Sequence, residues 1–204
     1  MLHAGEAFYA LGEIARNKGN WEEAKHAFRQ AHEFGHDPVP GLPLLRLAQG
    51  KREAARQTIE RALGENPQDR LRRAQLLAAR SRIALANGDL VVAEEAAEEL
   101  FELSEKLGCP IHRAQGLMAQ GAVQLGREDA ESAAPTLREA WSILSELGLP
   151  YEAARVRVLM AKAYLQTGSL EDASLQFEAA ARTFGELGAR PDLEAVTKMI
   201  DAAS

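Results

Sequence analysis

A Leu-Gly pair with a proline close behind recurs in the second half of the chain, and it constrains the fold more than any other feature. It occupies residues 107–110, 147–150 and 187–191, so that the Leu-Gly pairs stand forty residues apart. An apolar residue followed by glycine is typical of a helix C-terminus, where glycine adopts the left-handed conformation. The proline is expected to prevent the helix from resuming. Three such stops at one interval predict that a single helical unit is repeated.

A second pattern places an alanine five residues after a glycine. It is found at Gly19/Ala24, Gly50/Ala55, Gly88/Ala93 and Gly168/Ala173. A fifth copy fits through Ala133, although Glu128 takes the place of its glycine. A small alanine at a helix crossing lets two backbones approach closely, and a large residue four positions later, such as Phe28 or Phe177, would fill the space between pairs.

These patterns predict an all-α, single-domain, right-handed superhelix of about five antiparallel helix pairs and a capping helix. No pair can bury its apolar stripe alone, so the pairs must stack. In the second pair, Pro40 and Pro43 leave room only for a short first helix at about 43–49. The capping helix has Leu193, Val196 and Ile200 on one face and would cover the exposed end of the array. The expected pairs span residues 5–38, 39–68, 70–109, 111–149 and 151–188, and the capping helix spans 191–203.

Helix starts and unit length lead to two further expectations. Asn20, Asp89, Asp129 and Ser169 are placed to cap the second helices of their pairs, and Glu23 would complete a capping box with Asn20. The spacing between glycine and alanine is constant within each pair. The extra residues of a forty-residue unit should therefore lie in a longer second helix and in the loop that follows it.

Composition and charge narrow the class of protein. Only 5% of residues are aromatic, and the net charge of −6 argues against non-specific nucleic-acid binding by this chain. The single cysteine excludes an internal disulfide framework and fits a reducing compartment. Apolar runs are too short to cross a bilayer, and the N-terminus lacks the features of a signal peptide. We expect a cytoplasmic protein without membrane contact.

The arrangement Phe8-x2-Leu11-Gly12-x2-Ala15, followed by Gly19 and Ala24-x3-Phe28, resembles the tetratricopeptide (TPR) repeat. Residues 154–180 repeat it through Ala161, Tyr164, Gly168, Ala173 and Phe177. The resemblance implies a non-catalytic domain that binds protein or peptide partners in a concave groove lined by the first helix of each pair.

The long units and the Leu-Gly-x-Pro joints also resemble the helical sensor region of bacterial LuxR-type transcriptional regulators, the MalT-like ones included. The stretches at 44–50 and 150–159 carry this likeness most clearly. It implies an effector- or partner-sensing module for transcriptional regulation, whose DNA-binding domain would lie beyond residue 204. The alternative is a stand-alone TPR adaptor or scaffold that binds partner peptides or helices.

Helix phase assigns a set of side chains to the expected groove. The set is basic around Arg82, Arg155 and Lys162 and apolar around Met118, which suits an amphipathic helix or a small acidic effector. It lacks the asparagine and lysine set with which chaperone-binding TPR domains hold a terminal carboxylate. No cofactor is expected. The predicted groove residues are Tyr9, Glu13, Arg16, Gln75, Arg82, Gln115, Met118, Leu125, Arg155, Val158 and Lys162.

Two patterns that suggest catalysis have simpler explanations. His32-Glu33-Phe34-Gly35-His36 matches the H-E-x-x-H pattern of zinc proteases, but its glycine marks a helix end, where the two imidazoles would not share a face. Cys109 has His112 nearby, yet Leu149 is its repeat equivalent, so a small apolar filler explains it better than a nucleophile. No metal site and no enzyme activity are expected.

Two charge clusters and a pair of glycines complete the sequence features. The arginines at 70, 72, 73, 80 and 82 are interpreted as a solvated face that neighbouring acids partly neutralise. The acidic series between Glu94 and Glu105 is also interpreted as a solvated face, and the alternative is a surface that receives a basic partner. Gly116 and Gly121 fall within a helical pattern and are interpreted as positions of close packing.

Overall fold

Every regular element in the described part of the chain is an α-helix. The computed structural model describes residues 2–65 and 68–203. The eleven helices in these ranges are α1 (Leu2–Asn17), α2 (Trp21–Glu33), α3 (Gly41–Ala48), α4 (Arg52–Glu65), α5 (Arg70–Asn87), α6 (Leu90–Leu107), α7 (Pro110–Gly126), α8 (Ala130–Glu146), α9 (Pro150–Gln166), α10 (Leu170–Leu187) and α11 (Arg190–Ala203). None of them is both long and apolar enough to cross a lipid bilayer.

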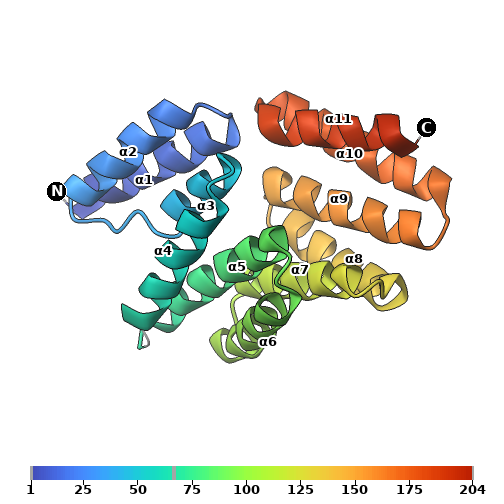
Figure 1. Ribbon diagram of the computed structural model, residues 1–204, viewed down its shortest axis with the longest axis horizontal. Coiled ribbons are helices and arrows are strands. Elements are labelled where there is room, and N and C mark those ends of the chain that lie inside the picture. The colour runs from blue at the N-terminus through green and yellow to red at the C-terminus, as the bar shows by residue number, and fades with distance from the viewer. Residues whose placement is uncertain (1, 66–67, 204) are drawn as a thin grey trace.

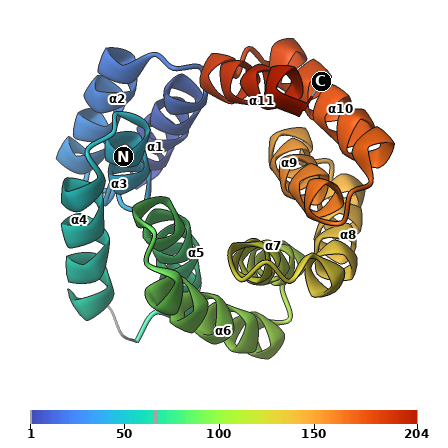
Figure 2. The same cartoon turned by 45° about the vertical axis from the view of Figure 1, so that its right-hand side comes forward.

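Consecutive helices pack as pairs, and the pairs follow one another around a ring (Figures 1 and 2). The first helices α5, α7 and α9 lie on the inner side of this ring, and the second helices α6, α8 and α10 lie on the outer side (Figure 2). The apolar core is correspondingly divided into clusters along the array, since each pair packs mainly against its neighbours. The all-α repeat architecture expected from the sequence is confirmed.

The helix crossings are formed by the repeated alanines. Ala24, Ala55, Ala93 and Ala133 are each 0% exposed, and Ala173 is 1% exposed. The large residues expected between the pairs, Phe28, Leu137 and Phe177, are buried as well. A larger side chain at one of these alanines would therefore overpack the crossing.

The two helical glycines in α7 are positions of close packing, as predicted. A Cβ atom on Gly121 would lie 2.5 Å from Cδ2 of Leu137 on α8. At Gly116 the corresponding distance to the Cα atom of Phe101 on α6 is 3.2 Å. The glycines thus allow α7 to approach both outer helices beside it.

The Leu-Gly joints end helices as expected, but their prolines act differently from the prediction. Gly108, Gly148 and Gly188 have φ angles of 60°, 67° and 68°, in the left-handed region. The following helices α7 and α9 begin at Pro110 and Pro150. Proline is well tolerated at the first helical position because its missing N–H group would have no intrahelical partner there. The prolines therefore start the next helix.

Glu128 confirms that the glycine position of the fourth pair needs the left-handed conformation. Its φ angle is 62°, and it is the sole non-glycine residue with positive φ in the described chain. The chain reverses here with φ in the same left-handed region as at Gly88 and Gly168, whose φ angles are 79° and 78°. A β-carbon in this region is strained, so the repeat geometry overrides the local preference of Glu128.

Half of the predicted helix caps are present. Asp89 and Asp129 accept hydrogen bonds from the backbone N–H groups of Val92 and Ser132, each at 3.1 Å. Asn20 and Ser169 make no such bond. The predicted capping box is also wrong. The Glu23 carboxylate accepts a hydrogen bond from the side-chain Nδ2 of Asn20, and the Asn20 side chain caps no backbone N–H group of α2.

The extra length of the later units lies in the helices themselves. The outer helices α6, α8 and α10 have 18, 17 and 18 residues, compared with 13 in α2 and 14 in α4. Only two residues join α6 to α7, so the predicted contribution of the loop is small. The shortened first helix of the second pair is present as α3, and it starts at Gly41 because Pro43 fits within the first turn of a helix.

Two apolar residues of the first helix do not pack as their spacing suggested. Leu11 and Ile14 are 54% and 52% exposed. The packed side of α1 carries Gly12, where a Cβ atom would lie 2.6 Å from the Phe28 ring, and Ala15, which is buried. Close packing on α2 therefore turns Leu11 and Ile14 towards the surface.

The capping helix does more than cover the last pair, because its start contacts the first pair and closes the ring (Figure 2). Nε of Arg190 donates to the carbonyl oxygen of Lys18 at 3.1 Å, and Nη2 donates to Oδ1 of Asn20 at 2.6 Å. A Cβ atom on Gly19 would lie 3.0 Å from Cγ of Pro191. The predicted exposed end of the array is therefore partly buried against its beginning.

Candidate functional site

A cavity of about 280 Å³ opens between the inner helices and α11. One face of α5 lines it through Ala78, Ser81, Arg82 and Leu85, which recur at helical spacing. Most of the remaining wall is apolar and comes from α7, α9, α10 and α11. The cavity thus combines an apolar interior with a few polar groups, as binding sites for small molecules commonly do.

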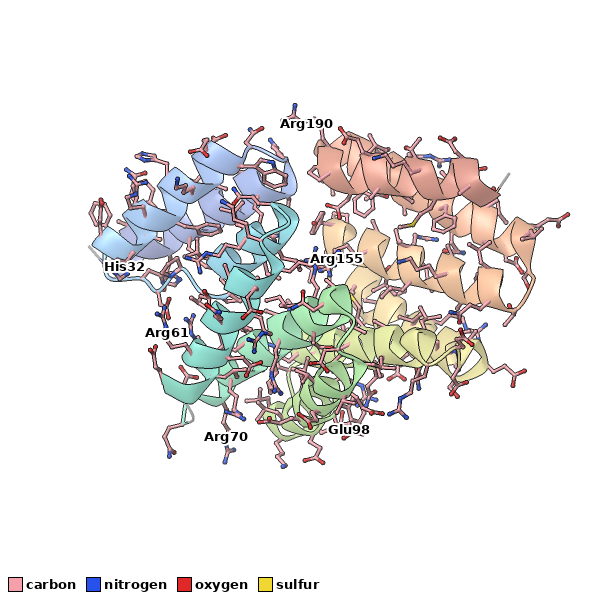
Figure 3. The ribbon with its side chains drawn as sticks, in the orientation of Figure 1. His32, Arg61, Arg70, Glu98, Arg155 and Arg190 are labelled. Carbon is pink, nitrogen blue, oxygen red and sulfur yellow. The ribbon has the colours of Figure 1, made fainter. Side chains whose placement is uncertain are left out.

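Several predicted groove residues meet at this cavity. Arg82, Gln115, Met118, Arg155 and Val158 all line it, although they come from three different helix pairs. Figure 3 shows Arg155 near the centre of the ring. Lys162 lines an adjoining hollow, which shares Met199 with the cavity, and burial lowers the pKa of its ammonium group.

The other predicted groove residues lie elsewhere. Tyr9 packs in the core of the first pair, and burial raises the pKa of its hydroxyl. Glu13 forms an ion pair with the buried Arg16 at 2.8 Å. Leu125 is buried in the core between α7, α8 and α9, and Gln75 is exposed on α5 outside the cavity.

Part of the wall was not anticipated from helix phase. Phe184 from α10 and Asp192, Val196 and Met199 from α11 contribute to it. The sequence marks these residues as apolar or solvent-facing positions of the last pair and its cap. Only the curvature of the array brings them opposite α5, and no local signal reports that curvature.

Arg82 and Arg155 line the cavity, the charge of Arg16 also acts on Arg82, and Arg82 alone of these three arginines lacks a partner among the described residues. Arg155 donates to Oε2 of Glu152 at 2.8 Å, and Arg16 is paired with Glu13. Arg82 has no hydrogen bond or ion pair with any residue in the described ranges. The charge of Arg155 and, secondly, burial lower the pKa of Arg82 to about 10.

Arg82 differs in this respect from its neighbours on α5. Three other arginines of the cluster pair with acids outside α5, as the sequence suggested: Arg72 with Asp37 between α2 and α3, Arg73 with Glu99 on α6, and Arg80 with Glu60 on α4. The acidic series on α6 is engaged in the same way, because Glu94 pairs with Arg127 and Glu105 with Arg113. These charges join neighbouring helices, both within a pair and between pairs, whereas Arg82 faces the cavity.

Two further polar groups at the cavity have unused hydrogen-bonding capacity. Oγ of Ser81 is buried and has no hydrogen-bond partner. Among the described residues with such a buried, unpaired side-chain atom, Ser81 is the one that belongs to the cavity wall. Oε1 of Gln115 contacts Nδ1 of His112 at 3.0 Å, which leaves the amide nitrogen of Gln115 available. Asp192 accepts a hydrogen bond from the Tyr151 hydroxyl at 2.9 Å.

The H-E-x-x-H motif and Cys109 both lie at helix ends in the structure. Helix α2 ends at Glu33, so His36 lies outside it and packs against the Tyr9 ring at 5.0 Å between centroids. No three metal-ligating side chains gather anywhere in the described ranges. Cys109 is the residue before α7 and is partly buried.

Comparisons with known proteins support the repeat assignment. Residues 5–35 match the family model described as tetratricopeptide repeat. The structure is similar to the crystal structure of BtubC (BKLC) from P. vanneervenii, with a TM-score of 0.55 and 16% sequence identity over 98% of this chain and 89% of that chain. At that identity the likeness shows the fold alone. No curated protein matches the chain.

The fold, the matched repeat and the structural neighbour together define a TPR-like helical-repeat domain. TPR repeats form a non-catalytic fold that serves interactions with proteins and peptides.

Proposed function

We propose that this chain is a non-catalytic recognition module that binds its partner or effector on the concave side of the ring. The observation that carries the proposal is the cavity between α5, α7, α9 and α11, where five of the predicted groove residues meet. Arg82 is partly buried, and a partly buried cation that makes no hydrogen bond or ion pair loses hydration without full compensation. Arg82 therefore favours an occupied site over a purely structural hollow.

The finer proposal places the module in a bacterial, cytoplasmic LuxR-type transcriptional regulator. The resemblance of residues 44–50 and 150–159 to the sensor regions of such regulators supports it. Here the chain would not contact nucleic acid itself, and binding at the cavity would act on a DNA-binding domain encoded beyond residue 204. A stand-alone adaptor that binds partner proteins is the alternative.

The reading frame after residue 204 in the native gene separates these two functions. A helix-turn-helix domain encoded there supports the regulator. A stop codon directly after residue 204 contradicts the regulator and supports the adaptor.

The site itself is tested by reversing charge at the cavity. The double variant Arg155→Glu, Lys162→Glu should abolish co-purification of bound proteins or small molecules, measured by native mass spectrometry of the full-length protein. The matched control is Arg61→Glu, Arg70→Glu, because both arginines are exposed and lie on the outside of the ring (Figure 3). Circular dichroism should be unchanged in both variants. Equal retention of bound molecules by the two double variants would refute the site.

A further inference from the structure

The polar corner of the cavity is formed by two successive residues of α5. Ser81 is 1% exposed, and its hydroxyl has no hydrogen-bond partner. A serine within a helix commonly bonds to a carbonyl group one turn earlier, but here this bond is not made. Arg82 beside it has no acceptor within the described chain. Arg82 therefore faces the cavity with nothing to donate to, and the Ser81 hydroxyl lies unpaired in the wall beside it.

An anion would relieve both unfavourable features. It would accept hydrogen bonds from Ser81 and Arg82, and hydrogen bonds that involve a charged partner are the strong ones. It would also reduce the repulsion between the Arg82 and Arg155 guanidinium groups, which lie near enough for Arg155 to shift the titration of Arg82. The amide nitrogen of Gln115 offers a further donor on the same cavity wall.

The other lining residues and the volume of the cavity indicate the polarity and size of the rest of the ligand. Most of the cavity's other lining residues are apolar and include Met118, Val158 and Met199, while the Asp192 carboxylate in the wall accepts a hydrogen bond from the Tyr151 hydroxyl. The volume of about 280 Å³ is near the lower limit of the roughly 300–1,000 Å³ typical of small-molecule sites. A compact molecule with an apolar chain fits these features.

The closed ring argues against a long helix as the occupant. Helix α11 forms one wall of the cavity, and Arg190 holds its start to Lys18 and Asn20 of the first pair. Figure 3 shows Arg190 at this junction. An amphipathic helix laid along the inner helices would have to displace that wall.

We propose that the cavity binds a small amphiphilic carboxylate, with the carboxylate at Ser81 and Arg82 and its apolar chain against Met118 and Met199. The proposal deepens the function proposed above and depends on the same site. It specifies a small-molecule effector by charge and polarity, whereas the recognition function needs only a binding surface on the concave side.

The test is a titration of the protein with decanoate, followed by NMR of ¹³C-labelled methionine methyl groups. The methyl signals of Met118 and Met199, which line the cavity, should shift and saturate. Met160 is buried in a core cluster outside the cavity, so its signal should stay unchanged and serves as an internal control. Decanol, which has no charge, and decylammonium, which has the opposite charge, should each bind at least about tenfold more weakly.

Substitutions then assign the head-group site. Arg82→Gln should weaken decanoate binding at least about tenfold, since it removes a charged donor. Arg70→Gln is the matched control, because Arg70 begins the same helix but is exposed outside the cavity (Figure 3), and it should leave the affinity unchanged. Ser81→Ala is a second, structurally milder test and should also weaken binding, by roughly threefold to tenfold.

Three results would overturn the carboxylate site. They are no saturable shift at Met118 and Met199, equal affinity for decanol, or unchanged decanoate binding by both Arg82→Gln and Ser81→Ala. If decanoate fails but charge reversal at Arg155 and Lys162 still abolishes partner binding, the recognition function stands and only the ligand class is wrong. If charge reversal also has no effect, both proposals fail.

Discussion

Replacing Ser81 by alanine should stabilise the ligand-free protein. Ser81 lies in the interior of α5, is 1% exposed, and keeps its hydroxyl without a hydrogen-bond partner. The hydroxyl must lose its hydration on folding, and nothing in the folded chain replaces the lost bonds. Such a residue is retained at a cost in stability, which is expected where the group serves a ligand.

The size of the gain follows from two contributions. A buried, unsatisfied polar group costs about 1–3 kcal/mol, and alanine has a helix propensity about 0.5 kcal/mol better than serine. The loss of one packed oxygen atom at Ser81 opposes these contributions, because it enlarges the space beside the cavity. We expect the free energy of unfolding to rise by about 1–2 kcal/mol. For a protein of this size, each kcal/mol raises the melting temperature by about 2–4 °C.

The assay is urea unfolding followed by circular dichroism, with Ser104→Ala as the matched control. Ser104 is also 1% exposed and also lies within a helix, but its hydroxyl donates to the carbonyl oxygen of Phe101 at 2.7 Å. Its removal deletes a hydrogen bond worth about 0.5–1.5 kcal/mol, which the better propensity of alanine partly offsets. Ser104→Ala should therefore be neutral or slightly destabilising.

A Ser81→Ala variant that is no more stable than the parent protein would refute the reasoning. If Ser81→Ala destabilises the protein as much as Ser104→Ala does, the Ser81 hydroxyl has a partner in the folded protein. It would then have no unmet bond to offer a ligand, and the carboxylate site would rest on Arg82 alone.

Three other substitutions or deletions test the repeat geometry. Glu128→Gly should raise the free energy of unfolding by about 1 kcal/mol, because it removes a β-carbon from a left-handed residue; no gain in urea unfolding would argue against strain there. Gly121→Ala should lower it by about 1–3 kcal/mol through the clash with Leu137, and a thermal melt unchanged from the parent would show that α7 and α8 are less closely packed. Deleting residues 190–204 should cause aggregation or loss of helicity, measured by light scattering and circular dichroism, because Val196 covers the last pair; a soluble, equally stable truncation would contradict this role.

The helix pairs could be predicted because their signals are local. Glycine at a helix end and alanine at a crossing each reflect a restriction that acts within a few residues, so their spacing along the chain gives the repeat directly. The same reasoning located the strained position at Glu128, where the repeat requires a glycine that the sequence lacks.

Predictions failed where a side chain had a choice of distant partners. Asn20 is of a residue type that often caps helices, but its Oδ1 accepts a hydrogen bond from Arg190, which is 170 residues away in sequence. Leu11 and Ile14 have helical spacing, yet the packing of α1 on α2 leaves them at the surface. Local propensity is a weak prior when a tertiary contact competes with it.

The sequence by itself determined that the protein is a stack of helix pairs, and helix phase placed Arg82, Met118 and Arg155 on its inner side. Only the tertiary structure decided that the stack closes into a ring, that α11 becomes a wall of the cavity, and that Ser81 and Arg82 are left there without partners. The physical reason is that the tilt of each pair on the next is small and accumulates over the array, so the final curvature depends on every interface at once.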